Sequence, residues 1–272
     1  MTYEDMLDFL LSELMSENQR FKQASIPKDI IEKRALLRAL MNLRPPKAIH
    51  SDVLEIQDQL LSFERNRKEI TDPDTLPTVA EKFLNSKISS ADNFVLWKGD
   101  ITTLSTDAIV NAANAKLLGC FIPHHRCIDN AIHSAAGIQL RLACQEIMQK
   151  QGHDEPTGQA KITQGYNLPA RYVLHTVGPI IYDEVTEADK LLLASCYTAC
   201  LNLASEYKDI KSLAFCSIST GEFRFPKDLA GRIALQTIGE WMEKSSGGFD
   251  KIVLNVFSQD DYEIYSRIFR ER

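Results

Sequence analysis

Two cysteines and two histidines lie within eight residues of one another, at positions 120, 124, 125 and 127. Sulfur and imidazole nitrogen are donors that zinc prefers, and three protein donors leave a position open, as catalytic zinc sites do. We expect Cys120, His125 and Cys127 to bind one Zn²⁺ ion, because Cys127 opens a predicted helix whose positive end favours a thiolate. His124 would point elsewhere. The alternative is a loop without metal, since the spacing is not that of a standard zinc finger.

Two further segments carry polar groups directly after predicted strands. Asn111 and Asn114 follow the strand 108–110 and are separated by two alanines. Carboxamides donate to and accept from sugar hydroxyls, and small neighbours let a ligand approach the backbone. Asp100 ends an earlier strand, a place where open α/β sheets bind ligands. Capping of a turn or helix by asparagine is the alternative for the first segment.

The segment 217–226 runs from a strand through a glycine-containing loop into a helix that proline begins. Backbone N–H groups in such a loop, together with a helix N-terminus, can bind phosphates. A plain strand-to-helix connection is the competing interpretation. Phe257 ends the last strand and could stack on a base or belong to the core. Histidines 133 and 175, on a predicted helix and strand, favour core positions.

Short β-branched or aromatic runs alternate with amphipathic ones from residue 93 onward. This pattern requires helical crossovers between strands and predicts a three-layer α/β/α sandwich with a mixed or mostly parallel sheet. The predicted strands are 94–97, 108–110, 161–166, 172–177, 213–218 and 252–257. The predicted helices are 127–149, 187–207, 227–244 and 260–269.

The first part of the chain is built differently. No glycine occurs before Gly99, and apolar residues recur there at helical spacing, with prolines between the runs. Three or four helices are therefore expected before residue 90. We divide the chain into a helical N-terminal extension, 1–90, and an α/β domain, 91–272. The extension either packs on the sandwich or forms a platform for a partner.

Composition excludes several classes of protein. The 272 residues carry a net charge of −6 without a long basic run, which argues against nucleic-acid binding. No apolar stretch reaches the length of a membrane span, so we expect no membrane association. The six cysteines fit a reducing cytoplasm better than a disulfide framework, and those at 144, 196, 200 and 216 read as packing residues.

Taken in order, the segments KGDIT, DAIVNAAN, IDNAIHSAAG, YVLHTVGP and SISTGEFRFP resemble the macrodomain, the ADP-ribose-binding α/β/α module. Common hydrolytic macrodomains have a run of glycines where this chain has the segment from Cys120 to Cys127. That difference resembles the zinc-dependent microbial macrodomains, protein-ADP-ribosyl hydrolases of the sirtuin-linked type with a helical extension. The genes of such proteins often accompany a sirtuin-type transferase and a lipoyl carrier protein.

The resemblance implies roles for individual residues. Asp100 would accept from the adenine amino group, the Ile101 N–H would meet a ring nitrogen, and Phe257 would stack on adenine. Asn111 and Asn114 would lie near the distal ribose, with Asp129 beside the scissile bond, and Asp129 and Asn114 are the expected catalytic pair. The pyrophosphate would bind to backbone donors of Ser219, Thr220, Gly221, Glu222 and Phe223. Arg224 stands where a glycine is usual.

The function implied is removal of mono-ADP-ribose from acidic side chains of a protein, with zinc polarising an oxygen while Asp129 orients or deprotonates a water or sugar hydroxyl. Two alternatives use the same cleft. One is a non-catalytic reader of ADP-ribosylated protein, and the other is a deacetylase of O-acetyl-ADP-ribose. ADP-ribose and a mono-ADP-ribosylated protein, with a lipoyl carrier as candidate, are the expected partners.

Overall fold

The computed structural model describes residues 1–19, 21, 23–245 and 248–271. Within them the strands form one six-stranded sheet in the order β1-β6-β5-β2-β4-β3, in which only β3 runs antiparallel to its neighbour. The strand bounds are Phe94–Lys98 (β1), Ala108–Ala112 (β2), Ala160–Gln164 (β3), Tyr172–Thr176 (β4), Ser212–Phe215 (β5) and Lys251–Val256 (β6). The predicted mixed, mostly parallel sheet is confirmed.

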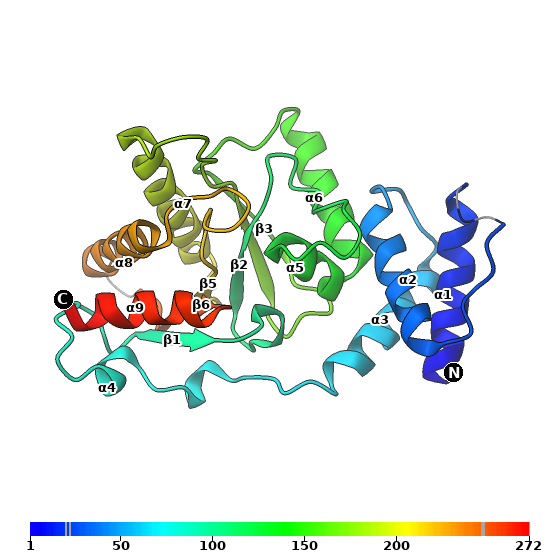
Figure 1. Cartoon of the computed structure of the whole chain (residues 1–272), viewed down its shortest axis with the longest axis horizontal. Helices are drawn as coiled ribbons and strands as arrows, with labels where there is room; N and C mark the ends of the chain where they lie inside the picture. Colours follow the sequence, from blue (N-terminus) through cyan, green and yellow to red (C-terminus); the bar gives the residue numbers. More distant parts are fainter. Residues whose placement is uncertain (20, 22, 246–247, 272) are drawn as a thin grey trace.

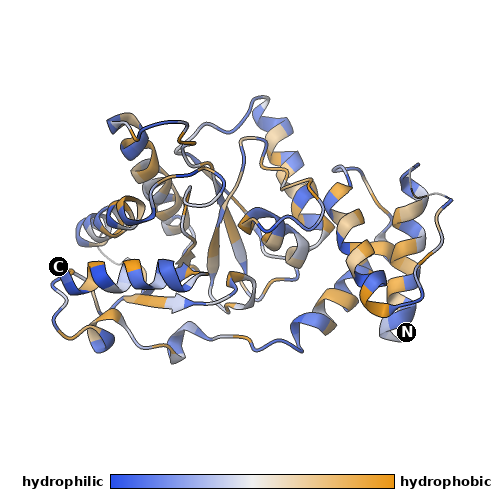
Figure 2. Cartoon of the chain, viewed as in Figure 1, coloured by the Kyte–Doolittle hydropathy of each residue, from blue (hydrophilic) through white to orange (hydrophobic). Residues whose placement is uncertain are grey.

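Helices cover both faces of the sheet (Figure 1). One layer holds α5 (Ile128–Ala136) and α6 (Ile138–Gln151), and the other holds α7 (Glu187–Ser205), α8 (Lys227–Lys244) and α9 (Gln259–Glu271). The strands are apolar along most of their length, whereas the outer helices alternate apolar and polar faces (Figure 2). This distribution is expected for strands buried between two helical layers. The α/β/α sandwich predicted from the sequence is therefore present.

The long helix predicted over 127–149 is wrong, because the structure has two helices there. Gly137 separates α5 from α6 with a φ of 98°, a left-handed conformation that side chains rarely adopt. A Cβ at this position would also lie 2.6 Å from Gln57 Nε2. The break redirects the chain, and it lets α6 meet the N-terminal helices.

The N-terminal region contains α1 (Tyr3–Glu17), α2 (Ile30–Leu43) and α3 (Ser51–Arg65), followed by a 3₁₀ turn, Pro73–Thr75, and the short α4 (Val79–Lys82). Leucines and methionines of α1, α2 and α3 form a hydrophobic cluster of their own, which Ile138 of α6 joins. Val79 of α4 belongs instead to the larger cluster around the sheet. The division at residue 90 stays a prediction. In the described part of the chain, no helix combines the length and the apolar character that crossing a bilayer requires.

Arg141 fastens α2 to α6. Its guanidinium is buried and donates to the carbonyl oxygens of Met41, Asn42 and Arg44, and its Nε donates to Leu118 O at 2.7 Å. The last carbonyls of a helix have no partner within the helix, so a cation at this end satisfies them and complements the helix dipole. One side chain thus ties the N-terminal region to the loop that follows β2.

Asp107 joins the start of β2 to the start of β5, and its loss is expected to destabilise the fold. Its Oδ2 accepts from the N–H groups of Lys211 and Ser212, and its Oδ1 accepts from Arg171. Burial opposes these bonds, but the bonds prevail and hold the pKa of Asp107 below its usual value of 3.8. Asp107→Asn should lower the free energy of unfolding by about 1 to 2 kcal/mol at pH 7.

Urea denaturation at pH 7 and at decreasing pH measures this effect. Because the folded-state pKa is depressed, the contribution of Asp107 is complete above the unfolded value of 3.8 and disappears as the pH falls through the lower folded value. The two proteins should therefore converge in acid. Asp209→Asn, which removes the exposed ion pair to the same Arg171, is the control and should change stability by less than about 0.5 kcal/mol. An equal loss in both variants would contradict the assignment.

Candidate functional site

A cleft of 580 Å³ opens at the carboxyl ends of β2, β5 and β6. Open parallel sheets bind ligands at this edge. The loop between β2 and α5 forms one wall, and the loop between β5 and α8 forms the other. The predicted site residues in its lining are Asn114, Cys120, His125, Cys127, Asp129, Ser219, Thr220, Gly221, Glu222, Phe223 and Phe257.

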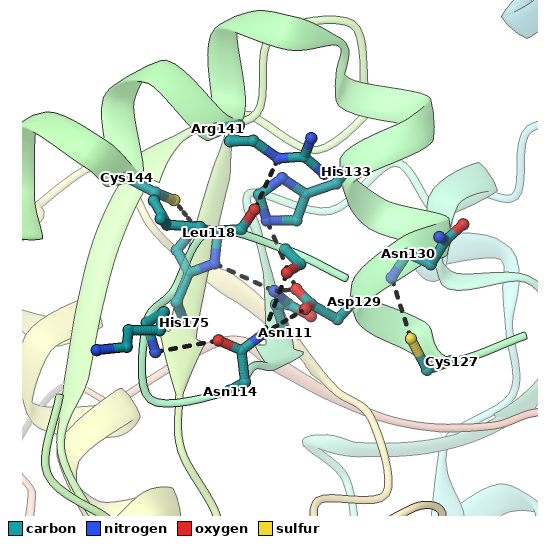
Figure 3. Close-up of polar contacts among 12 residues, drawn as sticks. Asn111, Asn114, Leu118, Cys127, Asp129, Asn130, His133, Arg141, Cys144 and His175 are labelled. Carbon is teal, nitrogen blue, oxygen red and sulfur yellow. Dashed lines mark hydrogen bonds and ion pairs between the residues drawn. The ribbon is translucent and has the colours of Figure 1, made fainter. Parts of the chain in front are cut away.

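Asp129 lies in the first turn of α5 with only 4% of its surface exposed. Asn111 Nδ2 donates to its Oδ1 at 2.8 Å, and Asn114 Nδ2 approaches its Oδ2 at 3.3 Å (Figure 3). Burial raises the pKa of Asp129 to about 6, and the bond from Asn111 partly offsets this rise. The carboxylate is therefore held in one orientation at the cleft wall, where it can accept a proton.

Asn111 is fully buried and does not line the main cleft, and the ribose contact implied by the resemblance stays a prediction. It pairs in register with His175 on β4, and its Nδ2 donates to His175 Nδ1 at 3.2 Å as well as to Asp129. His175 Nε2 then carries the proton and donates to Thr163 Oγ1 at 2.9 Å. Asn111 thus links the carboxylate to the sheet.

Cys120, His125 and Cys127 gather at the rim of the same cleft, while His124 stays outside the group. Their donor atoms all lie within 4.8 Å of one another, and Cys120 Sγ is 3.5 Å from His125 Nδ1. Tetrahedral zinc with ordinary bond lengths holds sulfur and nitrogen donors about 3.3 to 3.8 Å apart. The donor types and the separation of Cys120 Sγ from His125 Nδ1 fit a zinc ion.

Cys127 is the N-cap of α5, as expected, and its Sγ accepts from the Asn130 N–H at 3.4 Å. Burial nevertheless raises the pKa of the Cys127 thiol to about 12, and the nearby Cys120 and Asp129 add to the rise against the bond from Asn130. The helix end alone therefore does not produce a thiolate. A cation bound beside the sulfur would favour its deprotonation.

Glu222 reaches across the cleft to the predicted ligand group. Its Oε1 lies 3.5 Å from His125 Nε2, while Nδ1 of the same ring faces Cys120. Histidine ligands commonly donate their second ring nitrogen to a carboxylate, which fixes the ring and its tautomer. Sequence reasoning placed Glu222 only among the backbone phosphate donors, so it missed this contact from the side chain.

The loop between β5 and α8 contains two residues in the left-handed region. Ser219 has a φ of 64° and Arg224 a φ of 57°. The resemblance places a glycine at position 224, a residue type that adopts this conformation without strain. Arg224 adopts it here, with its N–H bonded to Gly221 O at 3.0 Å. A Cβ on Gly178 would lie 2.0 Å from Ser219 Oγ, so a side chain at residue 178 would force the Ser219 hydroxyl to move.

Asp100 and Ile101 lie away from the main cleft lining. Asp100 is exposed in a separate cleft of 130 Å³ between α2, α3 and α5, and Ile101 is buried. Asp100 Oδ1 caps a 3₁₀ turn, Ile101–Thr103, by accepting from the Thr102 N–H at 3.0 Å. Phe257, by contrast, lines the main cleft with 81% of its surface exposed.

A second group of donors lies behind the cleft, formed by His133, Cys144 and His175. All three side chains are buried, which agrees with the core positions expected for them. Both nitrogens of His175 are already engaged, with Asn111 and Thr163. Burial lowers the pKa of His175 to about 4 and that of His133 well below its usual value. We therefore assign these three residues to the protein core next to Asp129, with both imidazoles neutral, and not to a metal site.

Comparison with known proteins decides the family. The macro domain family matches residues 110–234. A protein-ADP-ribose hydrolase of Treponema medium is 48% identical over 268 residues, which cover 98% of this chain and 99% of the relative. The chain belongs to the macro domain family.

Further relatives of this macro domain protein support the same family assignment. A protein-ADP-ribose hydrolase of Staphylococcus aureus strain MRSA252 is 41% identical, over 97% of this chain and 94% of the relative. The Trypanosoma brucei macrodomain in complex with ADP-ribose superposes with a TM-score of 0.64 at 30% identity, over 85% of this chain and 94% of the other. The macrodomain fold and family expected from the sequence motifs are thus confirmed.

Proposed function

We propose that this macro domain protein is a hydrolase that releases mono-ADP-ribose from an acidic side chain of a modified protein, with one zinc ion bound by Cys120, His125 and Cys127. The observation that carries the proposal is that these ligands and Asp129 line one cleft. The relatives named as protein-ADP-ribose hydrolases, similar over nearly the whole chain, support the reaction class. The donor set and its spacing support zinc.

Binding and catalysis would be carried out by different residues of this chain. Backbone donors from Ser219 to Phe223 hold the pyrophosphate, and Phe257 stacks on adenine, with Asp100 and Ile101 beyond it at the neighbouring cleft. The distal ribose then lies between Asn114 and Asp129. Asp129 accepts the proton of the attacking water, whose oxygen bonds to the anomeric carbon as the bond to the substrate carboxyl breaks. Bound zinc would act as a Lewis acid toward developing negative charge.

Asn111 and Asn114 hold the base in place. Both donate toward the Asp129 carboxylate, at 2.8 Å and 3.3 Å, so its orientation does not depend on substrate. Asn114 also donates to Gly119 O at 3.1 Å, which joins the carboxylate to the start of the ligand loop. We infer that Asn114 acts in catalysis together with Asp129. Asn111 holds the Asp129 carboxylate from the buried side of the cleft wall.

The proposal includes finer expectations that rest on the resemblance. A lipoyl carrier protein modified by a sirtuin-type transferase stays a prediction for the substrate. A cytoplasmic location fits the six free cysteines. Membrane and nucleic-acid partners are not part of the proposal.

The decisive assay compares release of free ADP-ribose from an aspartate- or glutamate-linked protein with simple retention of that protein. We expect release, together with about one zinc per chain by metal analysis. Retention without release would favour a reader of the modification. Faster turnover of O-acetyl-ADP-ribose than of modified protein in direct competition would favour the small-molecule deacetylase.

Phe257→Ala should weaken ADP-ribose binding about tenfold, because stacking on an aromatic ring contributes about 1 to 3 kcal/mol per base. The ring is exposed, so the melting temperature should stay unchanged. Isothermal titration with ADP-ribose measures the effect. Tyr182→Ala is the control, since this ring is 75% exposed and lies outside the cleft lining. Equal affinity of the Phe257 variant and the wild type would rule out the stacking role.

A further inference from the structure

Helix α2 sends two polar side chains toward the metal-ligand loop of the macro domain. Arg38 and Asn42 lie four residues apart and therefore on one face of the helix. The apolar residues Leu37, Leu40 and Met41 of the same helix belong to the N-terminal hydrophobic cluster. Helix α2 lies beside α5 in Figure 1, and the two are in contact. The helix thus has one face for its own cluster and another for α5 and its preceding loop.

Asn42 bonds directly to the backbone of the ligand loop. Its side chain is 1% exposed, its Oδ1 accepts from the His124 N–H at 3.2 Å, and its Nδ2 donates to Ser134 Oγ at 3.0 Å. His124 has a φ of 57°, which is unfavourable for a residue with a side chain. The bond that His124 donates to Asn42 supports this strained residue, which immediately precedes the predicted ligand His125.

Asn130 carries the second connection. Arg38 Nη2 donates to its Oδ1 at 3.0 Å, and Ser134 Oγ lies 3.3 Å from the same atom. With Oδ1 so engaged, Nδ2 turns to the loop and donates to Ile122 O at 3.0 Å. The Asn130 backbone N–H donates to Cys127 Sγ (Figure 3). Arg38 therefore fixes a fully buried asparagine that contacts both the loop and a predicted ligand.

We propose that α2 is part of the support of the metal site and that Arg38 and Asn42 are positioning residues for the loop 120–127. This inference rests on the proposed function for the metal itself. It gives the N-terminal helices a role within the macro domain's own site, through residues 82 and 92 positions away in the chain. A loop held from outside loses less conformational entropy when it binds an ion.

Two variants and a matched control test the inference. Asn42→Ala removes the bond to His124, and Arg38→Gln removes the bond to Asn130 at a half-buried site that should tolerate the change. Arg65→Gln is the control, because Arg65 Nη1 also joins the N-terminal helices to the rest of the chain, at Asn167 O, but does not bond to the loop. Each protein is measured for zinc affinity by chelator competition and for ADP-ribose affinity by titration.

We expect Asn42→Ala and Arg38→Gln each to weaken zinc binding by about tenfold, the scale of losing a group that orients a ligand. In Asn42→Ala, ADP-ribose affinity should change less than about twofold, because Asn42 lines neither the main cleft nor the cleft that holds Asp100. Arg65→Gln should leave zinc affinity unchanged. Unchanged zinc affinity in folded Asn42→Ala and Arg38→Gln would overturn the inference. An equal loss of zinc affinity in Arg65→Gln would also overturn it.

Amide hydrogen exchange in the metal-free proteins decides the same question without zinc. The His124 amide should exchange roughly five- to tenfold faster in Asn42→Ala than in wild type, because one backbone donor has lost its partner. The Arg65→Gln protein should match wild type. Equal protection of the His124 amide in all proteins would refute the positioning role of Asn42, even if zinc-dependent release of ADP-ribose is confirmed. If the wild-type protein takes up no zinc but His124 exchanges faster in Asn42→Ala than in wild type, the proposed metal is refuted and the support of the loop by Asn42 stands.

Discussion

Cys127→Ala is expected to reduce hydrolysis of mono-ADP-ribosylated protein by at least about a hundredfold while ADP-ribose still binds. The variant removes one of three predicted zinc ligands, and the two that remain cannot hold the ion in the geometry the site supplies. The pyrophosphate and adenine contacts come from the other loop and from Phe257, so the nucleotide should bind as before. Steady-state hydrolysis, metal analysis and titration with ADP-ribose measure the three quantities.

The control for this variant is Cys200→Ala. Cys200 is fully buried in the large core cluster, away from the cleft lining. Its loss should lower stability modestly and leave the zinc content and the rate per folded molecule unchanged. If the Cys127 variant kept its zinc and its rate, the ligand assignment would be wrong. If it lost ADP-ribose binding as well, the separation between the metal rim and the nucleotide contacts would be wrong.

Asp129→Asn should lower kcat by at least about a hundredfold, the usual contribution of a general base. A carboxamide cannot accept the proton of the nucleophile at neutral pH. Its NH₂ group would also meet the donating amides of Asn111 and Asn114 if it took the place of either carboxylate oxygen. Zinc content should be retained, because none of the three ligands changes. The measurement is a kcat and KM determination with metal analysis of the same sample.

Asp100→Asn makes the informative comparison with that variant. Asp100 caps the 3₁₀ turn beside the neighbouring cleft, and asparagine is also a good cap. Its change should therefore raise KM for the modified protein, through a weaker contact to the adenine, without lowering kcat. A large fall in kcat for Asp100→Asn, or an unchanged kcat for Asp129→Asn, would contradict the roles given to these carboxylates.

The layers of the fold were predictable because they follow from local patterns. Buried strands such as β2 read as short apolar runs, and long amphipathic segments read as crossover helices. The break at Gly137 escaped prediction, because a single glycine is tolerated inside a helical pattern, and its positive φ and its contact with Gln57 follow only from the folded structure. Several predicted strands are a few residues longer or shorter than those in the structure. Their ends lie in loops whose hydrogen bonds connect residues far apart in the sequence, which a local pattern does not reveal.

The site was predictable to the extent that its residues lie close in the sequence. Cys120, His125 and Cys127 share one loop, so their grouping needed no tertiary information. Asn111 is 18 residues from Asp129 and 64 residues from His175. The pairing of β2 with β4 brings Asn111 beside His175, and the placement of α5 brings Asp129 to the same asparagine.

The contacts of the N-terminal helices could not be predicted at all. Nothing in the local sequence of α2 distinguishes Asn42 from an ordinary surface asparagine. Its burial and its bond to His124 depend on how α2 docks against α5 and α6, which Arg141 fixes from the other side of the interface. Long-range docking of this kind is decided by shape and paired polar groups, and neither has a periodic signature in the sequence.

Removal and restoration of zinc in the wild-type protein tests the central claim most directly. The protein is stripped with a chelator, its fold is checked by circular dichroism and by ADP-ribose binding, and single-turnover release of ADP-ribose from a glutamate-linked substrate is followed. We predict that the stripped protein binds ADP-ribose but hydrolyses at least about a hundredfold more slowly, and that one equivalent of zinc restores the rate. Full hydrolysis by the folded, zinc-free protein would contradict the account.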